Sequence, residues 1–318
     1  MTSGSSQAPG IARRSDTDPK WAETGAKLGR QQGGKGQKPS ERAEGAFSHA
    51  IDKADADGLN GAVMRRPSLA LAFSLLLIPP VMALVGDAAM VRSANVGRHI
   101  VMIVSTRGNL CTGTALARDL VLTAGHCVAP AATYRVFLPG IAPPGLPLRS
   151  VTVHPRYSPK DYASGRVTAD VALLKLEGAL PADIVPARLA APPAPVAPGD
   201  RFVIAGYGGT SADSETGAGT PRAAVLVATG RPGTLQIRLV DPATRGERAG
   251  LGACTGDSGG PAFVDNGGGV YAVIGVVSWS TGPANSAGCG GLTGVTPLTL
   301  HRTWIDETAR RLGSQLSP

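Results

Sequence analysis

One eight-residue run constrains this chain more than any other: residues 254–261 read Cys-Thr-Gly-Asp-Ser-Gly-Gly-Pro. Glycines lack side chains, so the chain can turn sharply there and another backbone can approach closely. Ser258 at the centre of such a turn is suited to be an exposed nucleophile, with the amides of Gly256 and Ser258 facing a developing oxyanion. A Gly-rich surface turn without chemistry is equally consistent with this run alone. The choice depends on whether the chain supplies a base and a carboxylate that orients it.

Two further segments supply these groups. His126 follows the apolar run 120–122, so it lies at the end of an expected strand. Asp170 precedes the strongly apolar run 171–176 and lies at the mouth of another expected strand, where simple strand capping is the alternative role. The chain order is therefore His, Asp, Ser. Subtilisins and α/β-hydrolases use different orders, so the order itself discriminates between families.

These three segments resemble the trypsin/chymotrypsin family of serine endopeptidases, of the bacterial secreted type, in that family's order and at similar spacing. The resemblance covers residues 84–312, approximately. It implies peptide-bond hydrolysis through an acyl-enzyme intermediate, with Ser258 as nucleophile, His126 as general base and Asp170 as the group that orients the imidazole. It also implies that the amides of Gly256 and Ser258 form the oxyanion hole.

The four cysteines all lie after residue 83. Four cysteines permit three pairings, and no Cys-x-x-Cys spacing favours a metal site. The resemblance implies the pairs Cys111–Cys127, around the His segment, and Cys254–Cys289, beside the substrate pocket. Two disulfides indicate an oxidising compartment. Neither a metal ion nor a cofactor is expected.

Short apolar runs separated by turn signals dominate the chain after residue 96, and 43 glycines and 26 prolines suit such a pattern. Strands at this spacing predict barrels or a sandwich. The resemblance implies an all-β, trypsin-like fold: two six-stranded antiparallel β-barrels and a C-terminal helix. The expected bounds are 84–190 for the first barrel, 191–297 for the second, 298–312 for the helix and 313–318 for a tail.

The segment before the expected barrels has two parts. Residues 1–63 are rich in Gly, Ser, Gln and Lys without apolar periodicity, which predicts disorder. Residues 64–83 combine a basic start, an apolar stretch and small residues at the end, which indicates a signal peptide and a secreted or periplasmic protein. An uncleaved anchor is the alternative, although a bilayer requires about 20 apolar residues. A signal this far inside the chain suggests that Met64 is the true start and that 1–63 is an upstream reading-frame artefact.

The resemblance also indicates a substrate pocket. Ser278 is expected to support Asp170 by a hydrogen bond, and Ser280 to pair with an extended substrate backbone. Gly252 stands where trypsin-like enzymes carry an Asp for Lys or Arg substrates, and a buried cation there would lack a partner. We therefore expect cleavage after small to medium apolar residues. The expected pocket residues are Gly252, Ala253, Ser278, Trp279, Ser280 and Gly294.

Asp257 is expected to take part in activation, with turn stabilisation as its simpler role. In the family a newly exposed α-amino group pairs with the Asp before the catalytic Ser. Residues 84–87, Leu-Val-Gly-Asp, resemble the family's Ile-Val-Gly-Gly terminus and directly follow the expected signal peptide. Signal removal alone would then expose the amine of Leu84 and let it pair with Asp257.

Other functions are alternatives to that of an endopeptidase. A catalytically silent relative that acts as a binding module usually lacks Ser, His or Asp, and this chain keeps all three. An esterase-like hydrolase would use the same site. After residue 83 the chain holds 20 basic and 15 acidic residues without a dense basic run, so nucleic-acid binding is not expected. The expected partners are polypeptide substrates and protein inhibitors, and the expected state is a monomer.

Overall fold

The computed structural model describes residues 86, 88–90, 96–191, 196–211, 216–229 and 235–317, all within one compact unit. The expected extension 1–63, the expected signal peptide 64–83 and the expected terminus at Leu84 lie outside the described residues. None of the described helices is long and apolar enough to cross a membrane.

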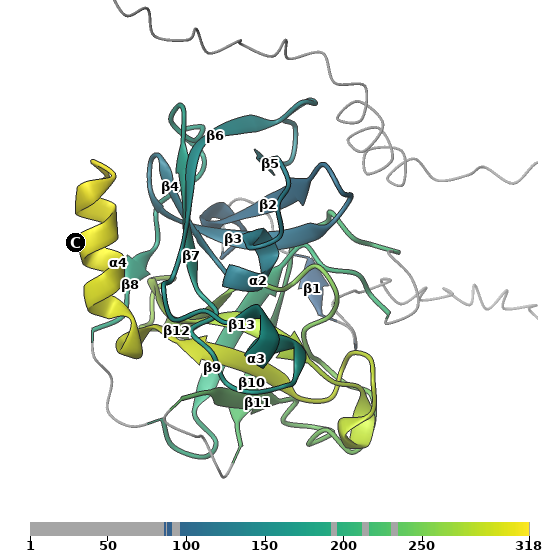
Figure 1. Cartoon of the computed structure of the whole chain (residues 1–318). Coiled ribbons are helices and arrows are strands. Elements are labelled where there is room, and N and C mark those ends of the chain that lie inside the picture. Colours follow the sequence, from purple (N-terminus) through teal and green to yellow (C-terminus); the bar gives the residue numbers. More distant parts are fainter. Residues whose placement is uncertain are drawn as a thin grey trace, which may run out of the picture. The chain divides into compact units, whose positions relative to one another are not determined.

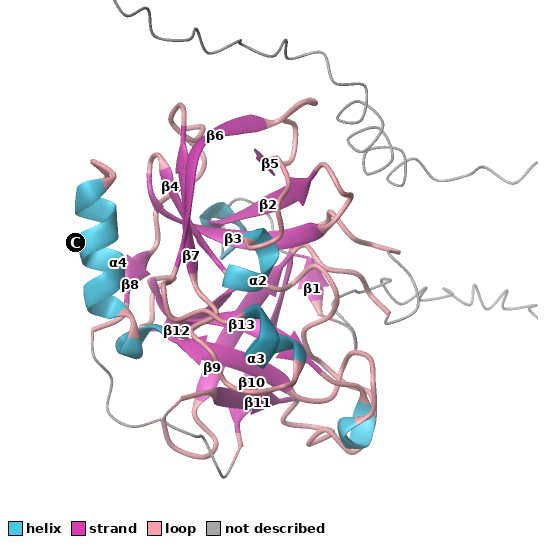
Figure 2. Ribbon diagram, viewed as in Figure 1, coloured by secondary structure: helices cyan, strands magenta, loops and turns pink. Residues whose placement is uncertain are grey.

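The first barrel is a closed antiparallel sheet in the order β2-β3-β4-β7-β6-β5 (Figures 1 and 2). It closes because β2 pairs with β5 as well as with β3, so no strand of the ring is left with an unpaired edge. Its strands are β2 (Ile100–Ser105), β3 (Leu110–Ala117), β4 (Leu120–Thr123), β5 (Tyr134–Phe137), β6 (Leu146–Val153) and β7 (Ala172–Leu176).

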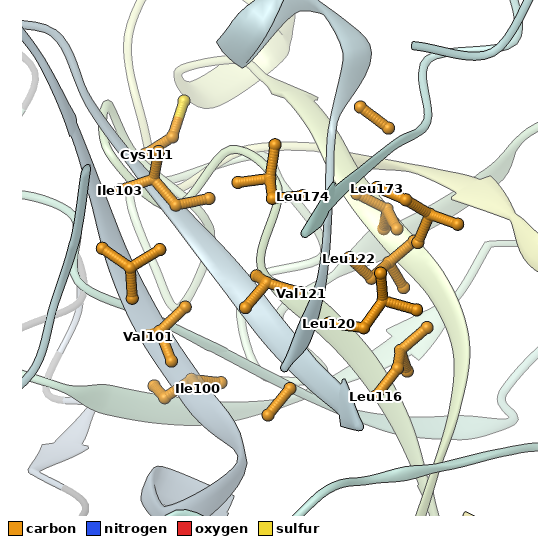
Figure 3. Close-up of a cluster of buried hydrophobic side chains, with 14 of the residues drawn as sticks. Ile100, Val101, Ile103, Cys111, Leu116, Leu120, Val121, Leu122, Leu173 and Leu174 are labelled. Carbon is orange, nitrogen blue, oxygen red and sulfur yellow. The ribbon is translucent and has the colours of Figure 1, made fainter. Parts of the chain in front are cut away.

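Several strands of this barrel are buried on both faces. Every residue of β2, β4 and β7 is buried, which explains why their sequences read as continuous apolar runs rather than as alternating patterns. Figure 3 shows how side chains of β2, β3, β4 and β7 gather into one cluster. Its labelled members are Ile100, Val101, Ile103, Cys111, Leu116, Leu120, Val121, Leu122, Leu173 and Leu174.

The second barrel closes in the same way, because β9 pairs with both β10 and β12. Its strands are β9 (Arg201–Gly206), β10 (Arg222–Ala228), β11 (Ile237–Val240), β12 (Pro261–Asp265), β13 (Tyr271–Ser280) and β14 (Thr293–Pro297). The expected all-β fold of two six-stranded antiparallel barrels with a C-terminal helix is confirmed.

Two short strands from the first half of the chain join this second sheet. The strand β1 (Ala89–Met90) pairs with β10, and β8 (Arg188–Leu189) runs parallel to β13. Both lie within 84–190, the range expected for the first barrel.

The described helices are short except for the last one. The expected C-terminal helix 298–312 is a 3-10 turn, η3 (Leu298–Leu300), followed by α4 (Arg302–Arg311), which buries Ile305, Thr308 and Ala309. Lys175 of β7 pairs with Asp119 and donates to Ser314 Oγ at 2.8 Å, which ties the chain end to the first barrel. The others are η1 (Val96–His99), α2 (Gly125–Val128), α3 (Pro159–Ala163) and η2 (Pro283–Asn285).

Candidate active site

A cavity of about 350 Å³ is lined by residues of both barrels, and the three expected catalytic residues line it or lie directly behind its wall. His126 and Ser258 line the cavity, and Asp170 lies behind His126. The first barrel contributes residues from the β2–β3 hairpin and from α2, and the second contributes the Ser258 turn and the end of β13.

Strand register brings His126 and Asp170 together. The antiparallel pair β4–β7 aligns Thr123 with Ala172, so the chain leaving β4 and the chain entering β7 meet at one end of the barrel. There the backbone N–H of His126 donates to Asp170 Oδ1 and the ring Nδ1 lies 2.8 Å from Oδ2. Since the carboxylate accepts from Nδ1–H, Nε2 is left as the proton-accepting nitrogen.

Asp170 is held by more than the imidazole. It is 1% exposed, and Ser278 Oγ of β13 donates to its Oδ2 at 2.5 Å. The ring of Tyr162 in α3 stacks on His126 with centroids 4.4 Å apart and planes 12° apart, and its hydroxyl donates to the Ser278 carbonyl at 3.0 Å. Burial, and then the charge of Asp170, raise the pKa of Tyr162 far above its usual value, so it stays a neutral donor. Three separate elements therefore fix one imidazole.

The Ser258 turn is shaped by its glycines. Gly256 has φ +97° and Gly259 has φ +82°, a region that favours glycine. The Ser258 carbonyl accepts from Thr112 N at 2.8 Å, which fixes the turn to β3. The amides of Gly256 and Ser258 donate to no described group, and no hydrogen bond joins Ser258 Oγ to His126. The two amides are thus free to bind a ligand oxygen.

Asp257 points away from the cavity into the second barrel. Its carboxylate accepts from the backbone N–H groups of Gly208 and Cys254, both at 2.8 Å. Burial raises the pKa of Asp257 to about 7, while these two amides and the charge of Arg222 act in the opposite direction. A cation beside this carboxylate would relieve the cost of its burial.

The expected pocket residues divide into two sets. Ala253, Ser278, Trp279 and Ser280 line the cavity. Gly252 and Gly294 do not. A Cβ on Gly252 would lie 3.0 Å from Gly290 Cα, and a Cβ on Gly294 would lie 2.0 Å from the Trp279 indole.

Sequence reasoning missed two residues at this site. Thr293 is fully buried directly behind Ala253, and its Oγ1 accepts from the Ala253 N–H at 3.0 Å. It is next to Gly294, so an exact register for β13–β14 would have been needed to find it. Tyr162 precedes Asp170 by eight residues, and no motif marks it in the sequence.

The cysteines form the two expected disulfides, Cys111–Cys127 and Cys254–Cys289. Cys111 and Cys127 also lie with His126 in a group whose atoms are close enough to hold a metal ion. Because both sulfurs are bonded to each other, neither can act as a thiolate ligand.

The family model described as Trypsin matches residues 88–305, which is more than half of the chain. The chain belongs to the trypsin family. It is a serine-type endopeptidase, and its substrates are polypeptides.

Three similar proteins and one solved structure support this family membership. The chain is 30% identical over 219 residues to Trypsin 5G1 of Aedes aegypti, covering 63% of this chain and 76% of the relative. It is 28% identical to snake venom serine protease rhinocerase 4 of Bitis rhinoceros, covering 66% and 82%. It is 30% identical to Serine protease SP24D of Anopheles gambiae, covering 69% and 79%. The solved structure of human heparin binding protein, 21% identical, shares the trypsin-family fold at a TM-score of 0.55, covering 74% of this chain and all of that one.

Proposed function

We propose that Ser258, His126 and Asp170 are the catalytic triad of this endopeptidase. One observation carries the proposal: the buried carboxylate of Asp170 lies 2.8 Å from His126 Nδ1, and His126 lines the same cavity as Ser258. The missing hydrogen bond between Ser258 and His126 does not weigh against it, since such bonds often tighten only when substrate binds.

The steps follow from these groups. His126 Nε2 takes the Ser258 hydroxyl proton as Oγ bonds to the scissile carbonyl carbon, and the amides of Gly256 and Ser258 bind the oxyanion. The C–N bond then breaks, and His126 gives its proton to the departing amine. Water, deprotonated by the same nitrogen, then adds to the acyl carbonyl carbon. The ester C–O bond breaks, His126 returns its proton to Ser258 Oγ, and the acid is released. Asp170 stabilises the imidazolium throughout.

Active-site labelling tests the triad. A fluorophosphonate probe should label the processed protein at one site, and the label should disappear in Ser258→Ala because the attacking oxygen is gone. His126→Ala should slow labelling by at least a hundredfold, since a free hydroxyl is a poor nucleophile. Ser286→Ala, which removes an exposed hydroxyl that does not line the cavity, is the matched control. Undiminished labelling of Ser258→Ala would rule the triad out.

We infer that the enzyme is not specific for Lys or Arg and cleaves after small to medium apolar residues. Among the described residues no Asp or Glu lines the cavity, and Thr293 fills the space behind Ala253. A peptide library should show cleavage mainly after residues such as Ala and Val, and Thr293→Gly should extend cleavage to larger side chains. A strong preference for Lys or Arg would contradict the inference.

We also propose that the protein is secreted or periplasmic, of the bacterial secreted type, with 64–83 as its signal peptide and Leu84 as the activating terminus. Two disulfides and the relation to a snake venom protease support export. In this proposal the enzyme is monomeric, and protein inhibitors bind to the same cavity.

A further inference from the structure

The hairpin between β2 and β3 contributes a charged side chain to the cavity that the proposed chemistry does not use. Ser105, Arg107, Asn109 and Leu110 line the cavity on the first-barrel side. Of the described residues that line it, Arg107 alone carries a permanent charge, and none is Asp or Glu. Within the described part of the chain its guanidinium makes no ion pair. A substrate carboxylate would therefore meet no internal competitor there.

The backbone that carries Arg107 is held in place by a buried serine. The hydroxyl of Ser105 accepts from the N–H groups of Arg107 and Asn109, both at 3.2 Å, and its carbonyl accepts from Gly108 N at 2.9 Å. Gly108 has φ +83°, as the tight end of the hairpin requires. Because the backbone is fixed, only the Arg107 side chain must be ordered when a ligand binds, which keeps the entropic cost of binding low.

The hairpin lies next to the segment that carries His126, and both line the same cavity. His126 protonates the departing amine in the proposed mechanism, so the substrate segment after the scissile bond passes beside it. The disulfide Cys111–Cys127 joins the residue next to His126 to β3, which begins at Leu110. Arg107 precedes Leu110 by three residues, which span at most about 10 Å. An extended substrate covers that distance in two or three residues.

We propose that Arg107 selects polypeptide substrates with Asp or Glu at the second or third position after the scissile bond. This inference rests on the proposed triad and names the substrate class of the same site. Burial raises the pKa of Tyr134, which lines the cavity, and the charge of Arg107 acts in the opposite direction, so that charge lies close to this part of the cavity. An acidic side chain would pair with this charge, and a basic one would be repelled by it.

A matched set of quenched fluorescent peptides tests the proposal. The peptides share one cleavable sequence and carry Glu, Gln or Lys at the second or the third position after the scissile bond. In 50 mM salt the wild-type kcat/KM should favour Glu over Gln by about two- to fivefold, the range of an exposed ion pair. The preference should shrink in 1 M salt, where the screening length falls to about 3 Å.

Variants then assign the preference to one side chain. Arg107→Gln should abolish it, Arg107→Lys should retain it, and Arg107→Glu should make Lys the preferred residue. Arg149→Gln, which removes an exposed arginine of β6 that does not line the cavity, should leave the ratio unchanged. Equal Glu-to-Gln ratios in wild type and Arg107→Gln, with Ser258 still labelled by fluorophosphonate, would overturn this inference and leave the triad standing. Loss of both labelling and cleavage in the wild type would overturn the triad, and the inference with it.

Discussion

At the scale of single residues, the backbone of the Ser258 turn depends on the absence of side chains. A Cβ on Gly259 would lie 2.1 Å from Thr123 Oγ1 and 2.3 Å from the Thr112 carbonyl, at a φ of +82°. Both groups belong to the first barrel, whereas Ser258 lies just before β12 of the second barrel. The glycine thus permits the close approach that brings Ser258 and His126 to one cavity.

Gly259→Ala should therefore destabilise the protein by about 3 kcal/mol or more, from backbone strain and overpacking together. Urea unfolding measures this change. Gly267→Ala is the matched control, because Gly267 also has a positive φ, +85°, but has no atom within 4 Å of its would-be Cβ. The control should cost about 1 kcal/mol. Equal losses for the two variants would show that the packing at Gly259 contributes nothing.

At the scale of elements, the start of α4 is attached to the first barrel by a buried aromatic cluster. His301, just before α4, contacts His154 edge-on at a centroid distance of 4.7 Å, and Trp304 lies 4.7 Å from His154. His301 is 6% exposed, and its Nδ1 has no hydrogen-bond partner among the described residues. Burial, and then the nearby His154 and Arg156, lower the pKa of His301 to about 4.

This attachment predicts a loss of stability in mild acid. Folded His301 stays neutral down to about pH 4, whereas the unfolded chain takes up the proton below its ordinary pKa of 6.5. The stability present above pH 6.5 is therefore lost as the pH falls toward 4, by at most about 1.4 kcal/mol per pH unit from this group. His301→Gln should flatten the curve of unfolding free energy against pH.

Thr303→Ala, at an exposed position of the same helix, should leave that curve unchanged. Because burial also lowers the pKa of His154, a shallower acid loss should remain in His301→Gln. A variant curve that follows the wild type between pH 4 and 6.5 would contradict the assignment to His301.

At the scale of the whole molecule, the described part of the N-terminal segment packs on the second barrel. The strand β1 pairs with β10, and Ala88 is buried in that barrel's core. A Cβ on Gly86 would lie 2.4 Å from the Gly250 carbonyl carbon, close to the chain that leads into the Ser258 turn. This arrangement supports the proposal that a terminus two residues earlier can influence Asp257.

The start of the mature chain should then control activity. Protein that begins at Leu84 should be active, because its amine can neutralise the buried Asp257 carboxylate, and protein that begins at Met82 should be at least a hundredfold less active. N-terminal sequencing and kcat/KM on one peptide measure both. Asp257→Asn in the Leu84 form should lose activity to a similar degree, since an amide cannot form the ion pair. Equal activity of the two starting forms would remove the case for activation by signal cleavage.

Short-range patterns determined much of this protein. Apolar runs between turns predicted the strands, and the Gly-Asp-Ser-Gly run with His126 and Asp170 in family order predicted which residues would meet. The strand predictions succeeded because strand period and turn chemistry are properties of a few neighbouring residues, whereas the roles of the site residues stay predictions. The C-terminal helix was also predictable from its spacing, although the break at His301 was not.

Contacts between distant segments were decided only by the tertiary structure. The register of β4 with β7 brings together His126 and Asp170, 44 residues apart, and that of β13 with β14 puts Trp279 over Gly294. The register of β13 with β14 also determines where Thr293 lies. Its side chain supports the cavity wall at Ala253, a place for which the sequence had suggested Gly252 and Gly294. A shift of one residue in register would turn each side chain to the opposite face. Barrel closure fixes that register through pairings along the whole chain, so no local pattern contains it.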